Sequence, residues 1–161
     1  MRKTGWIVLA TGLAASSPAW AISIDKDIDT DVPAAKVWAT VGDFCGIGSW
    51  HPAIEKCVER KKNGVAVRTL TLAGGGGTLV EELVSRDDKK MTYTYKIVDG
   101  PLPVANYQST LTVEADADGK ETEVSWTGTF DAKGASDAEA EKVITGIYES
   151  GLKALVEKAA K

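Results

Sequence analysis

The sequence predicts an α+β fold: a curved, seven-stranded antiparallel sheet surrounds a long C-terminal helix, and two short helices follow the first strand. Apolar residues alternate with period two in a series of runs from Ile54 to Phe130, separated by turns. An amphipathic stripe with helical spacing follows Ser136. Because seven strands cannot pack flat on one helix, we expect the sheet to curl and enclose a pocket.

The N-terminal residues predict a signal peptide, residues 1–21, that is not part of this domain. Arg2 and Lys3 precede an apolar segment, 7–15, that is too short to span a bilayer. Ala19-Trp20-Ala21 matches the small-x-small pattern of signal peptidase, so we expect cleavage after Ala21. A buried N-terminal strand or helix is the alternative. We therefore expect a periplasmic protein without a membrane span, whose single domain covers residues 22–161.

The charge of the mature chain narrows the classes of partner. Loss of Arg2 and Lys3 lowers the number of basic residues from 19 to 17 against 23 acidic residues, so the net charge becomes −6. An acidic surface disfavours nucleic acid and anionic membrane as partners. It is compatible with docking onto a basic protein.

The first elements combine a strand with two short helices. Residues 22–30 alternate between isoleucine and polar side chains, which indicates a half-buried strand. Asp31 is a plausible helix cap, and Pro33 suits the first turn of a helix. Apolar residues then recur at helical spacing over 34–41. Glycines end this helix and leave room for a second short helix before His51-Pro52.

Six further strands and one long helix follow. The strands are predicted at 54–60, 65–73, 78–86, 90–98, 105–115 and 121–130. The glycine run 74–77 is a hairpin tip and not a phosphate loop, because no Lys-Ser/Thr pair follows it. Ser136 and Glu139 form a capping box at the start of the last helix. Gly151 lies on the apolar stripe of this helix, where either a neighbouring side chain fills the space or a cavity includes it.

The segment 43–57 holds both cysteines, the single histidine and Trp50. Two cysteines in an oxidising compartment most often pair, which predicts a Cys45–Cys57 disulfide around Trp50 and His51. A redox pair is the weaker alternative, since redox motifs place the second cysteine two residues after the first. In this interpretation Trp50 and His51 lie at the lip of a binding cavity.

His51 has two further interpretations, as a general base or as a metal ligand. A metal site needs three or four converging ligands, and the chain has no second histidine. We therefore expect no metal and no cofactor, and we assign no catalytic residue. Catalysis by His51 stays open as an alternative.

The hairpin 65–86 contains charged residues on an apolar background. If residues 73–77 form the loop, Leu72 pairs with Thr78 and Arg68 pairs with Glu82. On the concave face, Arg68 and Glu82 would form an ion pair in or at the mouth of the pocket, which indicates recognition of a polar ligand. In the other register both charges are solvated.

Four aromatic residues lie on the faces of the central strands that the alternation of apolar and polar residues predicts to be buried. Each has an apolar ring and one polar atom, so it either fills the core or lines the pocket. These residues are Tyr93, Tyr95, Tyr107 and Trp126.

The order strand–helix–helix–six strands–helix, with VPAAKVWATVGDF at the first helix and WHP after it, resembles the SRPBCC (START-like, polyketide cyclase/dehydrase-type helix-grip) superfamily over residues 22–161. WHP, RTLTLAGGGGTLVEEL, PLPVANY and WTGTF resemble its exported branch, the MxaD-like accessory proteins of methanol oxidation. The resemblance implies a ligand-sized cavity in a non-catalytic scaffold. For the narrower branch it implies a role in assisting a quinoprotein methanol dehydrogenase and its cytochrome c acceptor. A carrier of a small apolar or aromatic molecule and a cyclase or dehydratase using His51 are the alternatives.

Overall fold

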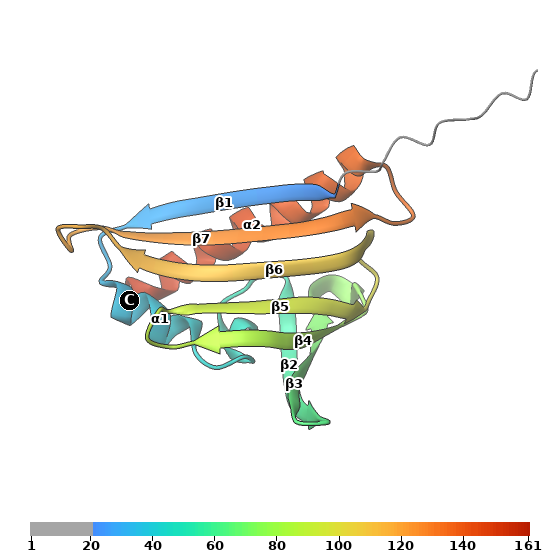
Figure 1. The fold of residues 1–161 in the computed structure, drawn as a ribbon, viewed down its shortest axis with the longest axis horizontal. Coiled ribbons are helices and arrows are strands. Elements are labelled where there is room, and N and C mark those ends of the chain that lie inside the picture. Colours follow the sequence, from blue (N-terminus) through green and yellow to red (C-terminus); the bar gives the residue numbers. More distant parts are fainter. Residues whose placement is uncertain (1–20) are drawn as a thin grey trace, which may run out of the picture.

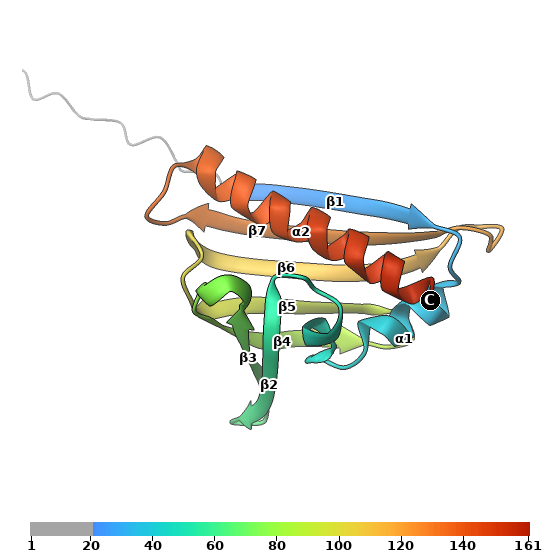
Figure 2. The same ribbon diagram turned by 180° about the vertical axis from the view of Figure 1, so that it is seen from behind.

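A seven-stranded antiparallel sheet curves around the C-terminal helix in the computed structural model, which describes residues 21–161 (Figures 1 and 2). The strands lie in the order β1-β7-β6-β5-β4-β3-β2, so β1 and β2 form the two edges. The strands are β1 (Ile22–Thr30), β2 (Ile54–Lys62), β3 (Val65–Leu72), β4 (Thr78–Asp87), β5 (Thr92–Asp99), β6 (Val104–Ala115) and β7 (Thr122–Ala132). The predicted fold class is confirmed.

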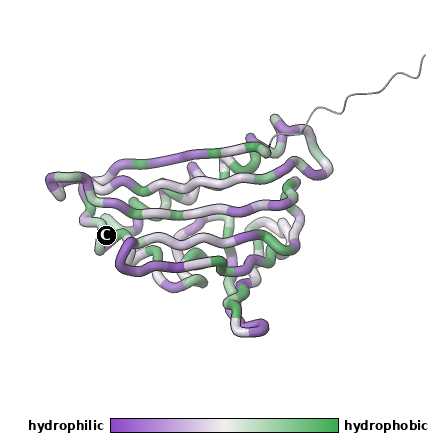
Figure 3. The backbone as a smooth tube through the Cα atoms, in the orientation of Figure 1, coloured by the Kyte–Doolittle hydropathy of each residue, from purple (hydrophilic) through white to green (hydrophobic). Residues whose placement is uncertain are grey.

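Alternation along the strands separates a core face from a polar convex face. In β6, Leu111 and Val113 are fully buried, whereas Thr110 and Thr112 between them are partly exposed. Figure 3 shows the same change of hydropathy along several strands. This period-two burial is the pattern of an antiparallel sheet with one solvated face.

The sheet curls most strongly where β4, β3 and β2 meet. In Figure 2, β2 and β3 run across the direction of the other strands and lie on the side of the sheet that carries the long helix. Register shifts interrupt the β4–β5 ladder and the start of the β2–β3 ladder. Such bulges bend a strand and increase its twist. Side chains of this hairpin and of the long C-terminal helix line the same cavity.

The long helix α2 (Asp137–Ala159) crosses the concave face of the sheet (Figure 2). The predicted capping box is confirmed: Ser136 Oγ accepts from the N–H of Glu139, and the Glu139 carboxylate accepts from the N–H of Ser136. The buried stripe of α2 comprises Ala140, Ile144, Tyr148, Gly151, Leu152, Leu155 and Ala159.

The two short helices differ in part from their prediction. Helix α1 (Ala34–Val41) packs against α2, but the predicted cap by Asp31 is wrong. Pro33 occupies the N-cap position with extended backbone, and no side chain caps the helix. The second helix is a single 3-10 turn, η1 (Gly46–Ser49), because the short glycine-containing segment before His51 leaves no room for a longer helix.

The predicted signal peptide, residues 1–21, lies outside the described residues except for Ala21. Among residues 21–161, no helix combines the length and hydropathy that a membrane span requires.

Candidate functional site

A cavity of about 230 Å³ lies between the concave face of the sheet, α2 and the segment that follows η1. It reaches the surface at the 3-10 turn η2 (Ala73–Gly75) between β3 and β4, because Ala73 and Gly76 are exposed and line it. Much of its wall is aliphatic and includes Ile54, Leu72, Ile97, Leu102, Ile144 and Ile147. Its polar wall comprises His51, Glu81, Tyr95, Tyr107 and Trp126.

The residues that the sequence singled out fall into three positions. Four of them line the cavity: His51, Tyr95, Tyr107 and Trp126. Three are buried but are not among its lining residues: Trp50, Arg68 and Tyr93. Glu82 lies outside it and forms an ion pair with Lys96 at 2.9 Å.

The predicted pairing of Arg68 with Glu82 is wrong. Arg68 pairs instead with Glu81, and its Nε lies 2.5 Å from Glu81 Oε2. The reason is the turn: the last β3–β4 pair is Thr71 with Thr78, so six residues separate the strands in place of five. A one-residue slip turns neighbouring side chains to opposite faces. Glu81 therefore faces the cavity, and the alternative with both charges solvated is wrong as well.

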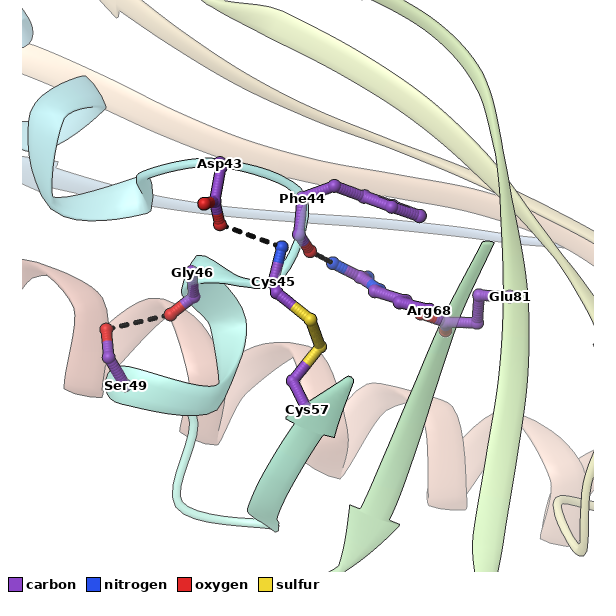
Figure 4. The surroundings of a disulfide bond; sticks show 8 residues. All are labelled: Asp43, Phe44, Cys45, Gly46, Ser49, Cys57, Arg68 and Glu81. Carbon is purple, nitrogen blue, oxygen red and sulfur yellow. Dashed lines mark hydrogen bonds and ion pairs between the residues drawn. A yellow bond between two sulfur atoms is a disulfide. The ribbon is translucent and has the colours of Figure 1, made fainter. Parts of the chain in front are cut away.

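Arg68 is fully buried between aromatic rings behind the cavity wall. Its guanidinium carbon lies 4.1 Å from the centroid of the Phe44 ring and 4.9 Å from that of Tyr95. Its Nη1 donates to the Phe44 carbonyl at 2.5 Å, as Figure 4 shows. Burial alone would lower the pKa of Arg68, but the Glu81 carboxylate raises it above its ordinary value. Burial raises the pKa of Glu81, and Arg68 opposes that shift.

The predicted disulfide joins Cys45, just before η1, to Cys57 in β2, with 5.6 Å between the two Cα atoms (Figure 4). Gly48 of η1 lies against Cys57, where an added Cβ would come within 3.1 Å of the Cys57 Cβ. The disulfide therefore anchors the turn that precedes Trp50 and His51. Trp50 packs into the core, and its indole N–H donates to the Val41 carbonyl at 3.3 Å.

Both ring nitrogens of His51 are engaged by backbone groups. Nδ1 accepts from the N–H of Ala53 at 3.1 Å, which leaves the proton on Nε2. Nε2 lies 3.1 Å from the carbonyl of Ile147 in α2 and donates to it. Burial, the largest effect, lowers the pKa of His51 to about 4, and the positive charge of Arg68 acts in the same direction. The ring is therefore a neutral brace between the loop and the helix.

Gly151 provides the space for this brace. A Cβ at Gly151 would lie 2.6 Å from His51 Cδ2 and 2.7 Å from Trp126 Cζ3. Neighbouring side chains therefore fill the predicted hole on the helix stripe, and the glycine permits the close approach.

Hydroxyl groups at the cavity wall and in the core behind it form a chain of hydrogen bonds. At both ends of the chain the donor and the acceptor are determined. At one end, the indole N–H of Trp126 donates to the hydroxyl of Tyr95 at 3.1 Å. At the other, Ser109 donates to the Thr127 carbonyl at 2.7 Å and accepts from Tyr148 at 2.9 Å.

Tyr107 connects the two ends. Because Tyr148 already donates to Ser109, Tyr107 donates to Tyr148, at 2.6 Å. The remaining contact, between Tyr95 and Tyr107, is long at 3.4 Å. Burial raises the pKa of Tyr95 and Tyr107, and that of Tyr148 to about 12, so all three hydroxyls keep their protons at neutral pH.

Sequence reasoning missed two residues of this site. Glu81 and Glu82 are adjacent, and only the length of the β3–β4 turn decides which of the two pairs with Arg68. Tyr148 belongs to the apolar stripe of α2, which by itself indicates only core packing, but its hydroxyl completes the chain and its ring stacks on Trp126 at 4.7 Å. A tyrosine on a buried helical stripe opposite aromatic strands is the signal that points to such a contact.

The polar groups that line the cavity are largely engaged by other groups of the protein. The lone pair of His51 is occupied, Glu81 is paired, and the tyrosines are protonated. Within residues 21–161, no group of three or more His, Cys, Asp or Glu side chains is placed to hold a metal ion.

Comparison with known proteins identifies the family. Residues 21–160 match the family described as polyketide cyclase/dehydrase and lipid transport. The chain belongs to this polyketide cyclase/dehydrase family. Membership agrees with the resemblance to SRPBCC proteins seen in the sequence. A search of curated proteins finds no match.

Solved structures of similar proteins share the fold of this family member. A protein of Bacillus thuringiensis is 33% identical, with a TM-score of 0.78, and covers 87% of this chain and 100% of its own. The protein XoxI of Bacillus cereus is 33% identical, with a TM-score of 0.77, over 86% of this chain and 96% of its own. The Zhui aromatase/cyclase of a Streptomyces species is 18% identical, with a TM-score of 0.70, over 88% of this chain and 94% of its own. This last likeness concerns the fold alone.

Proposed function

We propose that this protein binds and carries a small apolar or aromatic molecule and has no catalytic activity of its own. The observation that supports the proposal is the cavity of about 230 Å³, with its aliphatic wall and its aromatic, hydroxyl-bearing floor. Ligand sites are typically apolar hollows with a few placed polar groups. The matching family includes lipid transport as well as cyclases in its description.

A cyclase or dehydratase using His51 is the weaker hypothesis. A general base needs a free lone pair within reach of the substrate. The lone pair of His51 accepts the Ala53 N–H, and its proton is held by the Ile147 carbonyl. His51 would have to leave both partners before it could take a proton.

Native mass spectrometry of the purified protein, with and without added single-ring aromatic compounds, tests the carrier function. We expect a bound mass that disappears on unfolding. Ile97→Trp would fill the cavity and should abolish binding, whereas Val98→Trp, at the neighbouring exposed position, should not. A wild-type protein that retains none of these compounds, or equal binding by both variants, would contradict the proposal.

A second candidate is an exported accessory protein that acts beside a quinoprotein alcohol dehydrogenase and its cytochrome c in the periplasm. Its support is the resemblance of WHP, PLPVANY and WTGTF to the MxaD-like branch, together with a disulfide that fits an oxidising compartment. The acidic mature chain suits salt-sensitive docking to a basic partner.

Electron transfer from dehydrogenase to cytochrome, measured at low and high salt with and without this protein, tests the accessory function. Faster transfer at low salt that weakens at high salt is the expected result. No change at either salt would exclude the role. The Ile97→Trp variant separates the two candidates, because docking through the charged surface does not need the cavity.

A further inference from the structure

The polar wall of the cavity contains one charged group, and that group is negative. Glu81 lines the cavity, whereas its partner Arg68 lies behind the wall with no exposed surface. Arg68 Nε engages Oε2, so a carboxylate with about four lone-pair sites keeps acceptor capacity toward the cavity. A ligand anion would meet this carboxylate and not the guanidinium. A ligand cation would gain little, because Arg68 already balances the charge.

The same wall contains one donor that is not committed to a short hydrogen bond. Tyr95 must accept from the indole of Trp126, which has no acceptor atom. The Tyr95 proton is directed only at Tyr107, across the long 3.4 Å contact. Tyr107 cannot donate to Tyr95, since its own proton goes to Tyr148. The Tyr95 O–H can therefore turn to a ligand at small cost.

This donor and this acceptor are neighbours on the concave face. Glu81 of β4 pairs with Ile97 of β5, and Leu83 pairs with Tyr95, so Glu81 and Tyr95 are diagonal cross-strand neighbours. Long and aromatic side chains reach each other at such positions. A single hydroxyl group can serve both, because it donates one hydrogen bond and accepts another.

We propose that the cavity selects a neutral ligand of one or two rings that carries a hydroxyl group, a phenol or a ring alcohol, held between Glu81 and Tyr95. This inference rests on the proposed carrier function and names its ligand class. The size follows from the volume: an apolar cavity of about 150 Å³ holds benzene, and this cavity is about 230 Å³. The aliphatic wall of Leu72, Ile97 and Leu102 would contact the ring.

Four naphthalene compounds differ only in the group that would meet Glu81 and Tyr95. 2-Naphthol donates and accepts, 2-methoxynaphthalene only accepts, naphthalene does neither, and 2-naphthoate is an anion. Titration calorimetry at pH 7 should rank 2-naphthol first, about tenfold tighter than 2-methoxynaphthalene, since one net hydrogen bond corresponds to about that factor. 2-Naphthoate should bind most weakly.

Tyr95→Phe and Tyr93→Phe form the matched pair of variants. Both lose a buried hydroxyl from the same face of β5, but only Tyr95 lines the cavity. Tyr95→Phe should reduce the preference for 2-naphthol over naphthalene several-fold, and Tyr93→Phe should retain it. Circular dichroism establishes that each variant is folded.

The outcomes distinguish this inference from the proposed function. Equal binding of the three neutral compounds, tightest binding of 2-naphthoate, or an unchanged preference in Tyr95→Phe would overturn the hydroxyl selectivity and leave the carrier function standing. Absence of binding by all four compounds would overturn both.

Discussion

Replacing Gly151 by alanine is expected to destabilise the protein, although alanine is the better helix former. The new Cβ would lie 2.6 Å from His51 Cδ2 and 2.7 Å from His51 Nε2 and Trp126 Cζ3. Neither ring has a flexible end that can move away. To make room, the His51 ring would have to shift and strain its hydrogen bonds to Ala53 and Ile147.

The free energy of unfolding of Gly151→Ala follows from three contributions. Overpacking costs about 1–3 kcal/mol, and two weakened hydrogen bonds cost up to about 1 kcal/mol each. Better helix propensity returns about 1 kcal/mol. We therefore expect a net loss of about 2–3 kcal/mol, or a Tm lower by roughly 8 °C.

Gly146→Ala is the matched control in the same helix. Gly146 is exposed, and a Cβ there meets no atom within 4 Å. Alanine at this position should therefore stabilise the protein by up to about 1 kcal/mol. Urea unfolding of both variants, followed by tryptophan fluorescence and circular dichroism, measures the difference. If Gly151→Ala gained stability as Gly146→Ala should, the close packing of His51 and Trp126 on α2 would be refuted.

Three further predictions concern groups around the cavity. The pKa of His51 is about 4 in the folded protein, against 6.5 for an unperturbed histidine such as that of the unfolded chain. Between pH 6.5 and pH 4, therefore, the unfolded chain binds a proton on His51 and the folded protein does not. Stability should therefore fall by roughly 3 kcal/mol as the pH is lowered from 6.5 to 4, and urea unfolding of His51→Gln should lack this component. Reduction of Cys45–Cys57 should cost about 3 kcal/mol, measured by urea unfolding with and without reductant. Arg68→Met or Glu81→Leu alone should cost about 3–5 kcal/mol in thermal or urea unfolding, because each leaves its partner buried without compensation, whereas the double variant Arg68→Met with Glu81→Leu should regain much of the loss.

Each of these measurements has an outcome that would contradict its reasoning. A His51 resonance that titrates near pH 6.5 in the folded protein would show that the ring is not held neutral by burial. Unchanged stability after reduction would mean that the disulfide does not constrain the unfolded chain. Additive losses in the double variant of Arg68 and Glu81 would show that the two side chains do not interact.

Local patterns predicted the elements of the fold well, because strand and helix periodicities report which face of each element is buried. The strand Ile22–Thr30 and the Ser136–Glu139 capping box agree with the structure residue by residue. The capping box depends on side chains three residues apart, so a short stretch of sequence contains all the information that it needs. The fold class follows from the order of these elements.

The polar wall of the cavity was harder to predict, because the position of Glu81 in it depends on how β3 and β4 are paired. The turn that joins them adopts a 3-10 conformation with Gly74 at φ 66°, and it adds one residue to the loop. Alternation alone cannot detect that extra residue, since it describes each strand separately. As a result Glu82 was predicted in the place that Glu81 occupies.

The sequence by itself determined an α+β fold with a curled sheet, a capped C-terminal helix and two cysteines positioned to pair. Only the tertiary structure decided that His51 is a neutral brace against Gly151, that Glu81 pairs with Arg68, and that the cavity is open. The physical reason is the separation along the chain over which each interaction acts. Periodicity and capping act between residues a few positions apart, whereas the site is built from contacts between β3, β4, β5 and α2, which only packing brings together.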